Sequence, residues 1–272
     1  MAAALPLADL TASGTAAKCS IRNLELKSLK IVSLNCHGFN QGSEAIKAFC
    51  DTDDLDIDII FLQELWLTPE TYFKIETISE NHICYDKSAM DLAVRSSVLK
   101  GRPFGGVCIL LKSNIANLVK FSKTSERYSM VIIENYLFIS VYFPTISSDF
   151  DLCTVQSMIA DIEEVFISYP GLKMVCGGDF NVNLDNLVGR STVFTKFILD
   201  CGLIPTNKII ASNLAYTYCQ ETLQHYSYID YFLIDNDLKL KLLDFKILDL
   251  AINHSDHNTL YGAWLPVRSK DK

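Results

Sequence analysis

The sequence predicts one mixed α/β domain in which strands outnumber helices. Short apolar runs rich in Ile, Val, Phe and Tyr recur along the chain, and this length and composition are typical of strands. Helical periodicity is clear in one long segment and in shorter ones. Residues 128–133 and 137–142 form two apolar runs only a few residues apart, which favours antiparallel hairpins within the domain.

The expected strands differ in the arrangement of their apolar residues. Some alternate apolar and polar residues, as in a strand with one buried face, and others are continuously apolar, as in a fully buried strand. In chain order the expected strands cover residues 30–35, 57–63, 106–111, 128–133, 137–142, 173–177, 227–234, 246–251 and 259–264.

The longest expected helix covers residues 150–169. Ser147 or Ser148 can cap its start, and Pro170 and Gly171 end it. Shorter helices are expected over 43–50 and 192–201, and the second ends at Gly202. The long helix has one apolar face, formed by Val155, Met158, Ile159, Ile162, Val165 and Phe166.

Composition excludes several classes of protein. The 272 residues are 49% hydrophobic and 21% charged, which excludes a disordered or low-complexity chain. A net charge of −8 argues against a protein that holds polyanions by bulk positive charge, although it leaves local binding open. One acidic run is expected to be a solvated loop; it contains Asp51, Asp53, Asp54, Asp56 and Asp58.

Chain organisation predicts a flexible N-terminal arm over 1–27, one domain over 28–266 and a C-terminal tail over 267–272. The start lacks the basic and apolar regions of a secretory signal, and no apolar run reaches the roughly 18 residues that span a bilayer. We therefore expect an intracellular protein of the cytosol or nucleus, away from membranes. Nine cysteines without a C-x-x-C pair are interpreted as reduced, mostly buried thiols.

Polar residues at the ends of apolar strands are the candidate functional residues, because a scaffold would present them in a shared cleft. They come from five places in the sequence and are Asn35, Glu64, Tyr142, the pair Asp179 and Asn181, and the pair Asp256 and His257.

Asp179 and Asn181 suit a water-activating site, in which a carboxylate accepts a proton while an amide fixes orientation. An Asx-turn that merely caps the loop explains the same two residues equally well. Asp230 could orient the imidazole of His257. Zinc is disfavoured because no further ligand stands at a recognisable spacing, and a serine hydrolase is unsupported because no G-x-S-x-G occurs.

Glu64 is the candidate metal ligand. It follows a strand whose burial would make an unpaired carboxylate costly, and Mg²⁺ typically takes only one or two protein carboxylates. Asn35 and Asp256 could assist it. A strand-end glutamate that simply faces water is the alternative.

Seven short motifs occur in an order that resembles the endonuclease/exonuclease/phosphatase superfamily, which includes apurinic endonucleases and DNase I. The resemblance extends over about residues 30–264. The motifs are LNCHG at 34–38, LQE at 62–64, GGVCIL at 105–110, VYFPT at 141–145, GGDFNVN at 177–183, SYIDYF at 227–232 and SDH at 255–257.

The resemblance implies a DNase I-like, four-layer α/β sandwich with two packed mixed sheets and outer helices. It implies an Mg²⁺-dependent phosphodiesterase, with Mn²⁺ as an alternative metal. Glu64 matches the metal ligand, with Asn35 beside it, and Tyr142 matches a phenol that contacts the phosphate or leaving group. The other matched positions comprise the water-orienting pair Asp179 and Asn181, the imidazole support Asp230, the site members Asp256 and His257, and the nucleic-acid contacts Ser255 and Thr217.

Within the superfamily the chain looks most like the endonuclease domain of non-LTR retrotransposons, because of YTYC at 216–219 and the S-x-I-D form of 227–230. DNA is then the expected partner, with no obligate protein partner evident and with a larger retroelement polyprotein as one origin of the chain. Two alternatives stay open: a relative acting on RNA, a phosphoinositide or sphingomyelin, and a domesticated, non-catalytic binding domain. His37 departs from the usual residues between the family's Asn and Gly and is interpreted as peripheral.

Target-site preference is expected to depend on surface loops, such as 186–191 and 211–226, and on DNA deformability. Four tyrosines could line a DNA groove, although ordinary strand packing explains their spacing equally well. They are Tyr216, Tyr218, Tyr226 and Tyr228.

Overall fold

The computed structural model describes residues 28–52, 55–88 and 103–265. The predicted arm over 1–27, the tail over 267–272 and residue 266 lie outside the described residues, as do Asp53 and Asp54 of the acidic run. The domain itself is built from two six-stranded sheets and a separate hairpin.

The first sheet has the strand order β13-β14-β1-β2-β4-β3. β1 and β2 are parallel and the other neighbours are antiparallel, so the sheet is mixed. Its strands are β1 Leu29–Asn35, β2 Ile59–Gln63, β3 His82–Lys87, β4 Val107–Lys112, β13 Leu242–Leu248 and β14 Thr259–Trp264.

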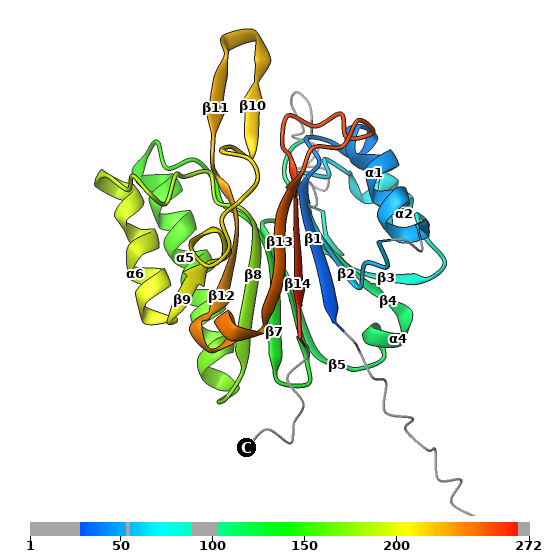
Figure 1. Ribbon diagram of the computed structural model, residues 1–272, viewed down its shortest axis with the longest axis horizontal. Coiled ribbons are helices and arrows are strands. Elements are labelled where there is room, and N and C mark those ends of the chain that lie inside the picture. Colours follow the sequence, from blue (N-terminus) through cyan, green and yellow to red (C-terminus); the bar gives the residue numbers. More distant parts are fainter. Residues whose placement is uncertain (1–27, 53–54, 89–102, 266–272) are drawn as a thin grey trace, which may run out of the picture.

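The second sheet has the order β5-β6-β7-β8-β12-β9. β7 and β8 are parallel and the remaining pairs are antiparallel. Its strands are β5 Val119–Thr124, β6 Tyr128–Ile133, β7 Tyr136–Tyr142, β8 Lys173–Asp179, β9 Leu203–Pro205 and β12 Asp230–Asp235. A third, two-stranded element, β10 Tyr218–Gln220 with β11 His225–Ser227, projects beyond one end of both sheets (Figure 1).

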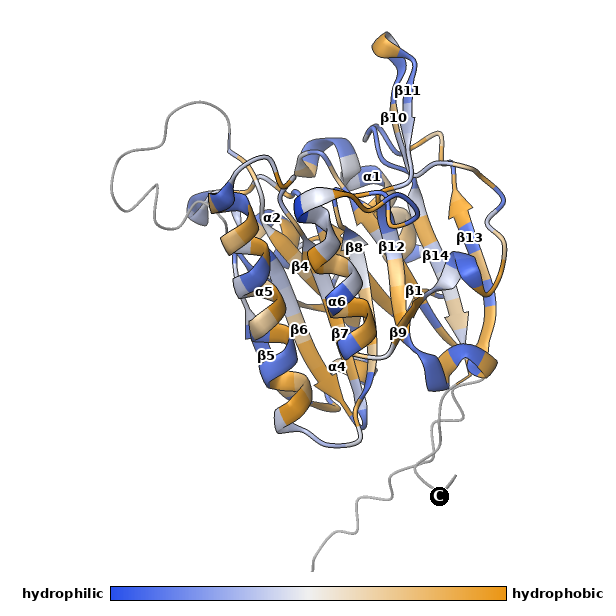
Figure 2. Cartoon of the chain, turned by 90° about the vertical axis from the view of Figure 1, so that its left-hand side faces the viewer, coloured by the Kyte–Doolittle hydropathy of each residue, from blue (hydrophilic) through white to orange (hydrophobic). Residues whose placement is uncertain are grey.

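Helices cover the outer faces of the two sheets. α1 (Phe39–Asp51) and α2 (Phe73–Glu76) lie beside the first sheet, and α5 (Asp149–Ser168) and α6 (Val193–Asp200) lie across the second (Figures 1 and 2). The short elements that remain are α4 Ser113–Ala116 and the 3₁₀ turns η1 Pro69–Thr71, η2 Gly189–Thr192, η3 Thr206–Lys208, η4 Glu221–Leu223 and η5 Asn236–Lys241.

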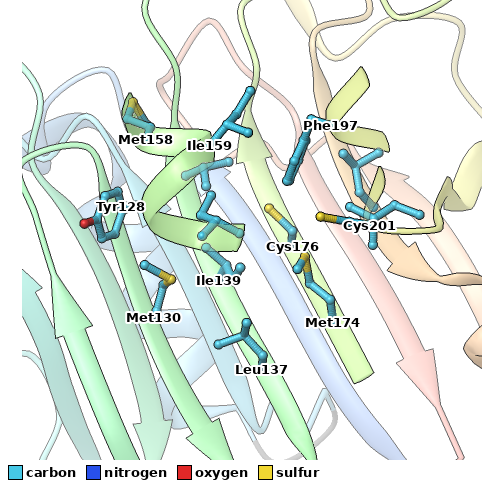
Figure 3. Packing of buried hydrophobic residues seen from close by; sticks show 14 of the residues in the cluster. Tyr128, Met130, Leu137, Ile139, Met158, Ile159, Met174, Cys176, Phe197 and Cys201 are labelled. Carbon is cyan, nitrogen blue, oxygen red and sulfur yellow. The ribbon is translucent and has the colours of Figure 1, made fainter. Parts of the chain in front are cut away.

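The core has a central layer between the sheets and an outer layer under each pair of helices. In the centre Phe61 of β2 meets Phe232 of β12 edge to face, with ring centroids 6.2 Å apart. Under α5, Met158 and Ile159 pack toward Met130 and Ile139 of the second sheet (Figure 3). This arrangement of helices, sheet, sheet and helices confirms the predicted four-layer sandwich.

Predictions for central elements were close to the structure. The expected strands over 128–133 and 259–264 are β6 and β14 residue for residue, and the helix expected over 150–169 is α5, shifted by one residue. The Ser148 hydroxyl accepts the backbone N–H of Asp151 at 3.2 Å, as predicted for a cap. The helix expected over 43–50 begins four residues earlier, at Phe39.

Peripheral strands were missed or misplaced. β3 and β5 are edge strands whose polar residues hid their pattern, although the alternation of apolar and polar residues at the start of VKFSKT in β5 is the signal that could have found it. The strand expected over 227–234 is two elements, because the chain leaves the hairpin after Ser227 and enters β12 at Asp230. The strand expected over 246–251 is β13, which begins and ends earlier.

The acidic run is not uniformly solvated, which corrects the sequence prediction. Asp56 is exposed, but Asp58 is buried and its carboxylate accepts the backbone N–H of Lys30 at 2.9 Å. Burial raises the pKa of Asp58 above its usual range. Lys112 pairs with both carboxylates, so this segment anchors β4 to the start of β2.

Two further expectations concern thiols and membranes. The eight cysteines within the described residues are free, in agreement with reduced thiols, and Cys19 lies outside those residues. No helix in the described ranges is long and apolar enough to cross a membrane.

Gly178 allows the two central strands of the second sheet to approach each other beside the site. Its φ is +144°, and a Cβ placed there would lie 2.0 Å from the backbone oxygen of Val141. Gly178 thus permits a close approach of the backbone of β7 and β8.

We expect Gly178→Ala to lower the free energy of unfolding by about 2 kcal/mol or more, because β7 and β8 would have to separate. Gly171→Ala is the matched control: its φ is +88°, but a Cβ there would meet nothing within 4 Å. Urea denaturation of both variants separates the cost of the positive φ from the cost of the clash, and equal losses would contradict the steric account.

Candidate active site

Candidate residues from both sheets meet at one edge of the sandwich. Asn35 ends β1 and Glu64 directly follows the parallel strand β2, while Tyr142 and Asp179 end the parallel strands β7 and β8 as partners in register. Asp230 opens β12 and is the antiparallel partner of Asp179. Parallel neighbours end at the same edge, so the topology gathers these side chains within each sheet, and the packing of the two sheets brings both sets together.

The amide of Asn35 joins the two sheets. Its Nδ2 donates hydrogen bonds to Glu64 Oε1 at 2.8 Å and to Asp179 Oδ2 at 2.9 Å. One amide nitrogen carries two N–H donors, so both carboxylates are satisfied at once. Asn35 is 1% exposed, and its Oδ1 accepts the backbone N–H of His37 at 3.0 Å.

Strained backbone is concentrated here. Seven non-glycine residues in the described chain have positive φ, and four of them belong to this site: His37, Glu64, Trp66 and Asn181. Left-handed conformations outside glycine are uncommon and persist where surrounding contacts impose them. At Glu64 those contacts include the Asn35 amide and the indole N–H of Trp66, which donates to Oε2 at 3.0 Å.

His257 forms a buried ion pair with Asp230. Nδ1 of the imidazole lies 2.9 Å from Asp230 Oδ2, and the two residues are 5% and 3% exposed. Burial opposes the charged imidazole, but the carboxylates of Asp230, Asp179 and Asp256 together outweigh it, so the pKa of His257 lies well above its usual value. The ring is therefore a cation at neutral pH. The ring of Tyr218, from the hairpin, packs 5.0 Å from it.

Asp179 is buried and strongly polarised. Its Oδ1 accepts the backbone N–H of Asn181 at 2.7 Å, and its Oδ2 accepts the Asn181 amide at 3.2 Å. Burial and the nearby Asp230 carboxylate raise the pKa of Asp179 above its ordinary value. The Asn181 amide also donates to the Phe143 carbonyl at 2.9 Å, which fixes its orientation. The Asx-turn hydrogen bonds expected of this pair are present, and the role of the two residues in activating water stays a prediction.

Tyr142 lies at the rim of this group. Burial, together with the Glu64 and Asp179 carboxylates, raises the pKa of its phenol, so the hydroxyl stays protonated and can donate a hydrogen bond. The guanidinium carbon of Arg127 is 5.4 Å from the ring centroid, within range of a cation–π contact.

Ser255 and Thr217 hold other site residues in place. The Ser255 hydroxyl donates to the Asn35 carbonyl at 2.6 Å and accepts the His257 N–H at 3.1 Å. Thr217 is 0% exposed, and its hydroxyl oxygen accepts the backbone N–H groups of Ile229 and Asp230, each at 3.0 Å. The expected contact of Thr217 with nucleic acid does not fit this burial, which instead makes it a positioning residue for Asp230.

Asp256 is paired with a residue that the sequence analysis set aside. Asp256 Oδ1 lies 2.5 Å from His37 Nδ1 and 3.9 Å from His257 Nε2. The His37 ring also packs edge to face on Trp66, with centroids 4.8 Å apart. His37 is thus part of the site, and its place two residues after Asn35 was the signal available in the sequence.

A divalent cation fits the donor atoms that the fold assembles. Atoms of Glu64, Asp179 and His257 lie within 4.8 Å of one another. Because His257 is held as a cation by Asp230, the two carboxylates are the donors suited to a hard ion such as Mg²⁺ or Mn²⁺. This grouping differs from the predicted set of Glu64, Asn35 and Asp256: Asn35 bridges the carboxylates through its N–H groups, and Asp256 faces His37.

The charge of this group of buried residues must be compensated by a proton or a metal ion. Glu64, Asp179 and Asp230 bring three carboxyl groups into one largely buried space, and the His257 imidazolium offsets one of them. Like charges in a shared, desolvated site are costly unless a proton or a metal ion compensates.

These side chains meet where the resemblance to the nuclease and phosphatase superfamily predicts them. Residues 32–257 match the model of the Endonuclease/Exonuclease/phosphatase family. The matched residues are well over half of the chain. The chain therefore belongs to that family.

Solved structures of the same fold are similar across most of the chain. A variant of the 3′ phosphatase NExo from Neisseria, bound to a product DNA hairpin, has a TM-score of 0.67 and 15% identity, with 87% of this chain and 99% of that chain covered. The AP endonuclease LMAP from Leishmania major has a TM-score of 0.66 and 13% identity, with 87% of each chain covered. An AP endonuclease from Archaeoglobus fulgidus has a TM-score of 0.63 and 16% identity, covering 87% of this chain and 99% of that one. The search of curated proteins found no match.

We expect Thr217→Val to lower the free energy of unfolding by about 2 kcal/mol, because the buried N–H groups of Ile229 and Asp230 would lose their acceptor. Thr217→Ser keeps the hydroxyl and should retain most of the stability. Thermal unfolding of both variants measures the difference. A Thr217→Val protein that is fully stable but binds DNA poorly would restore the direct contact predicted from the sequence.

Proposed function

We propose that this chain is a divalent-metal-dependent phosphodiesterase that hydrolyses the DNA backbone. Within that activity we propose an endonuclease that nicks DNA and leaves 3′-hydroxyl and 5′-phosphate ends. Membership of the nuclease and phosphatase family supports the reaction class, and the DNA hairpin bound by a relative of similar fold supports the substrate.

The observation that carries the proposal is the placement of the Glu64–Asn35–Asp179 bridge beside the Asp230–His257 ion pair. Buried carboxylates next to an imidazolium with a raised pKa combine a base with a cation in one site. Phosphodiester hydrolysis needs both, because water must lose a proton while negative charge grows on the phosphate.

Each side chain has a place in this reaction. A bound divalent ion would supply charge neutralisation at the phosphate and leaving oxygens, held by Glu64. Asp179, with its raised pKa, is a suitable acceptor for the water proton, and Asn181 fixes the carboxylate that accepts it. The His257 imidazolium donates a hydrogen bond to a phosphate oxygen, and the Tyr142 hydroxyl donates another at the rim.

The finer proposal is a retroelement-type nuclease that nicks target DNA. The YTYC and S-x-I-D motifs support it, and both lie at the projecting hairpin or its base. Tyr216 and Tyr226 pack together with centroids 4.9 Å apart, and Tyr226 is 49% exposed, so this pair offers an aromatic surface for a groove. Tyr228 instead packs on Tyr231 and belongs to the core. An enzyme of this kind would act inside the cell, where it meets chromosomal DNA.

We expect Glu64→Ala and His257→Ala each to reduce Mg²⁺-dependent nicking of supercoiled plasmid by about a hundredfold or more, since each removes a positioned charge from the reacting centre. Glu44→Ala and His254→Ala are matched controls, because both side chains are more than half exposed outside the site. Undiminished nicking by either site variant, with the controls also unchanged, would overturn the assignment. Release of nucleotides or terminal phosphate without plasmid relaxation would indicate an exonuclease or 3′-phosphatase instead.

We expect activity to depend on two opposed titrations. Asp179 must lose its proton to act as base, so kcat/KM rises with pH through the raised pKa of Asp179. His257 must keep its proton, so kcat/KM falls as pH passes the raised pKa of His257. In Asp230→Asn the anion that raises both pKa values is lost, and both limbs should move to lower pH. If kcat/KM of Asp230→Asn were lower at every pH but both limbs of the pH profile stayed in place, Asp230 would act only on the structure of the site.

A further inference from the structure

Two thiols and a carboxylate, none of them assigned to catalysis, lie together on the first sheet. The Sγ atoms of Cys84 and Cys108 are 2.9 Å apart, and Cys84 Sγ lies 3.1 Å from Asp86 Oδ2. Donor atoms of all three residues lie within 4.8 Å of one another. Cys108 is 0% exposed and belongs to the apolar cluster under α1 and α2, so the group lies on the helix-covered face of the sheet. It is as compact as a set of metal ligands.

The register of two neighbouring strands assembles this group. Cys108 of β4 is the antiparallel partner of Asp86 in β3. Cys84 stands two residues before Asp86 in the same strand, so the two side chains point to the same face. The two cysteines are 24 positions apart in the chain. Sequence spacing does not specify such a pair, which is why the cysteines gave no metal prediction.

The carboxylate distinguishes this group from ordinary packed thiols, which behave as small apolar side chains. Asp86 is partly buried, and among the described residues its carboxylate has no ion-pair partner. The hydrogen bond it accepts there comes from the thiol of Cys84, which is a weak donor. A partly desolvated carboxylate with so weak a partner favours a cation beside it.

The hydroxyl of Tyr72 is a second, independent sign. Its oxygen is buried and has no hydrogen-bond partner in the part of the chain that the structure describes. Burial raises the pKa of this phenol, and the nearby Asp86, Cys108 and Cys84 groups raise it further, so the hydroxyl lies within their electrostatic field. An orphaned buried hydroxyl calls for a partner such as an ion or an ordered water. A water held by a cation in this group would supply one.

We propose that Cys84, Cys108 and Asp86 bind one Zn²⁺ ion, with a water molecule as the fourth ligand. Two thiols and one Zn²⁺ give two zinc–thiolate bonds and release two protons to solvent. Soft thiolates together with one hard carboxylate suit the borderline ion Zn²⁺, whereas Cu(I) prefers sulfur and Mg²⁺ prefers oxygen. Tetrahedral Zn–S bonds of about 2.3 Å place two sulfurs roughly 3.8 Å apart, so the thiols separate by about 1 Å on binding.

Such an ion would fasten an edge strand to the sheet. β3 is the outermost strand of the first sheet and pairs with β4 alone. Ligands from both strands therefore add a link where the sheet has hydrogen bonds on one side only. This is a structural site separate from the metal site at Glu64, and the inference does not depend on the proposed nuclease function.

The test titrates the full-length protein, reduced and freed of metal, with Co²⁺, because cobalt–thiolate bonds give an absorption band that oxygen ligands do not. We expect one equivalent of Co²⁺ to produce the band and Zn²⁺ to abolish it. Cys84→Ser should weaken Zn²⁺ binding by about a hundredfold or more, since loss of a residue that only supports a ligand already costs about 10–100-fold. Asp86→Asn should weaken it about tenfold. Cys153→Ser is the matched control, because it removes an exposed thiol and should change nothing.

Thermal unfolding gives a second readout, made in Glu64→Ala so that Zn²⁺ at the catalytic carboxylates does not contribute. Zn²⁺ at a hundredfold excess over Kd should raise Tm by about 5 °C, and adding Cys84→Ser should remove the rise. Absence of the cobalt–thiolate band in the folded wild-type protein would overturn the site. A Cys84–Cys108 disulfide that persists in the presence of Zn²⁺ would also overturn it, as would a band unchanged in both Cys84→Ser and Asp86→Asn. None of these outcomes depends on nicking of plasmid, so this proposal and the nuclease function fail separately.

Discussion

One amide group holds the site together. Asn35, at the end of β1, donates to Glu64 on its own sheet and to Asp179 on the opposite sheet, so the distance between the two carboxylates is set by how the sheets pack. That packing rests on the central layer of the core, where rings such as Phe61 and Phe232 fill the space between the sheets. A change in sheet separation would therefore act directly on the catalytic geometry, which makes the core part of the active site in an energetic sense.

The charge distribution follows from the same constraint. Three buried carboxyl groups around one imidazolium form a site that favours cations, and the rest of the chain is nearly balanced once these acids and the 51–58 run are set apart. The overall charge of −8 therefore reflects one acidic run and one buried site, and it does not exclude local binding of a polyanion elsewhere on the chain.

Strained backbone and the hydrogen bonds that support it both lie within the site. His37, Glu64 and Asn181 adopt left-handed backbone conformations, and each is held by a hydrogen bond or ring contact to another residue of the site. Ser255 and Thr217 use their hydroxyls to fix the segments that carry His257 and Asp230. These hydroxyl groups thus set the orientation of the charged residues of the site, as preorganised sites require.

The sequence by itself determined the mixture of strands and helices and the polar residues that end the central strands, because buried strands and capped helices leave local patterns of hydrophobicity. The four layers were implied by the resemblance of its motifs to the nuclease and phosphatase superfamily, not by those patterns. It could not place edge strands such as β3 and β5, which have one neighbour and tolerate polar residues. Nor could the sequence decide which side chains pair. His37 contacts Asp256, which is 219 positions away in the chain, and the buried Thr217 accepts the backbone N–H of Asp230, which is 13 positions away. Only the tertiary structure fixes such pairs, because side-chain hydrogen bonding depends on distance in space, which sequence spacing does not specify.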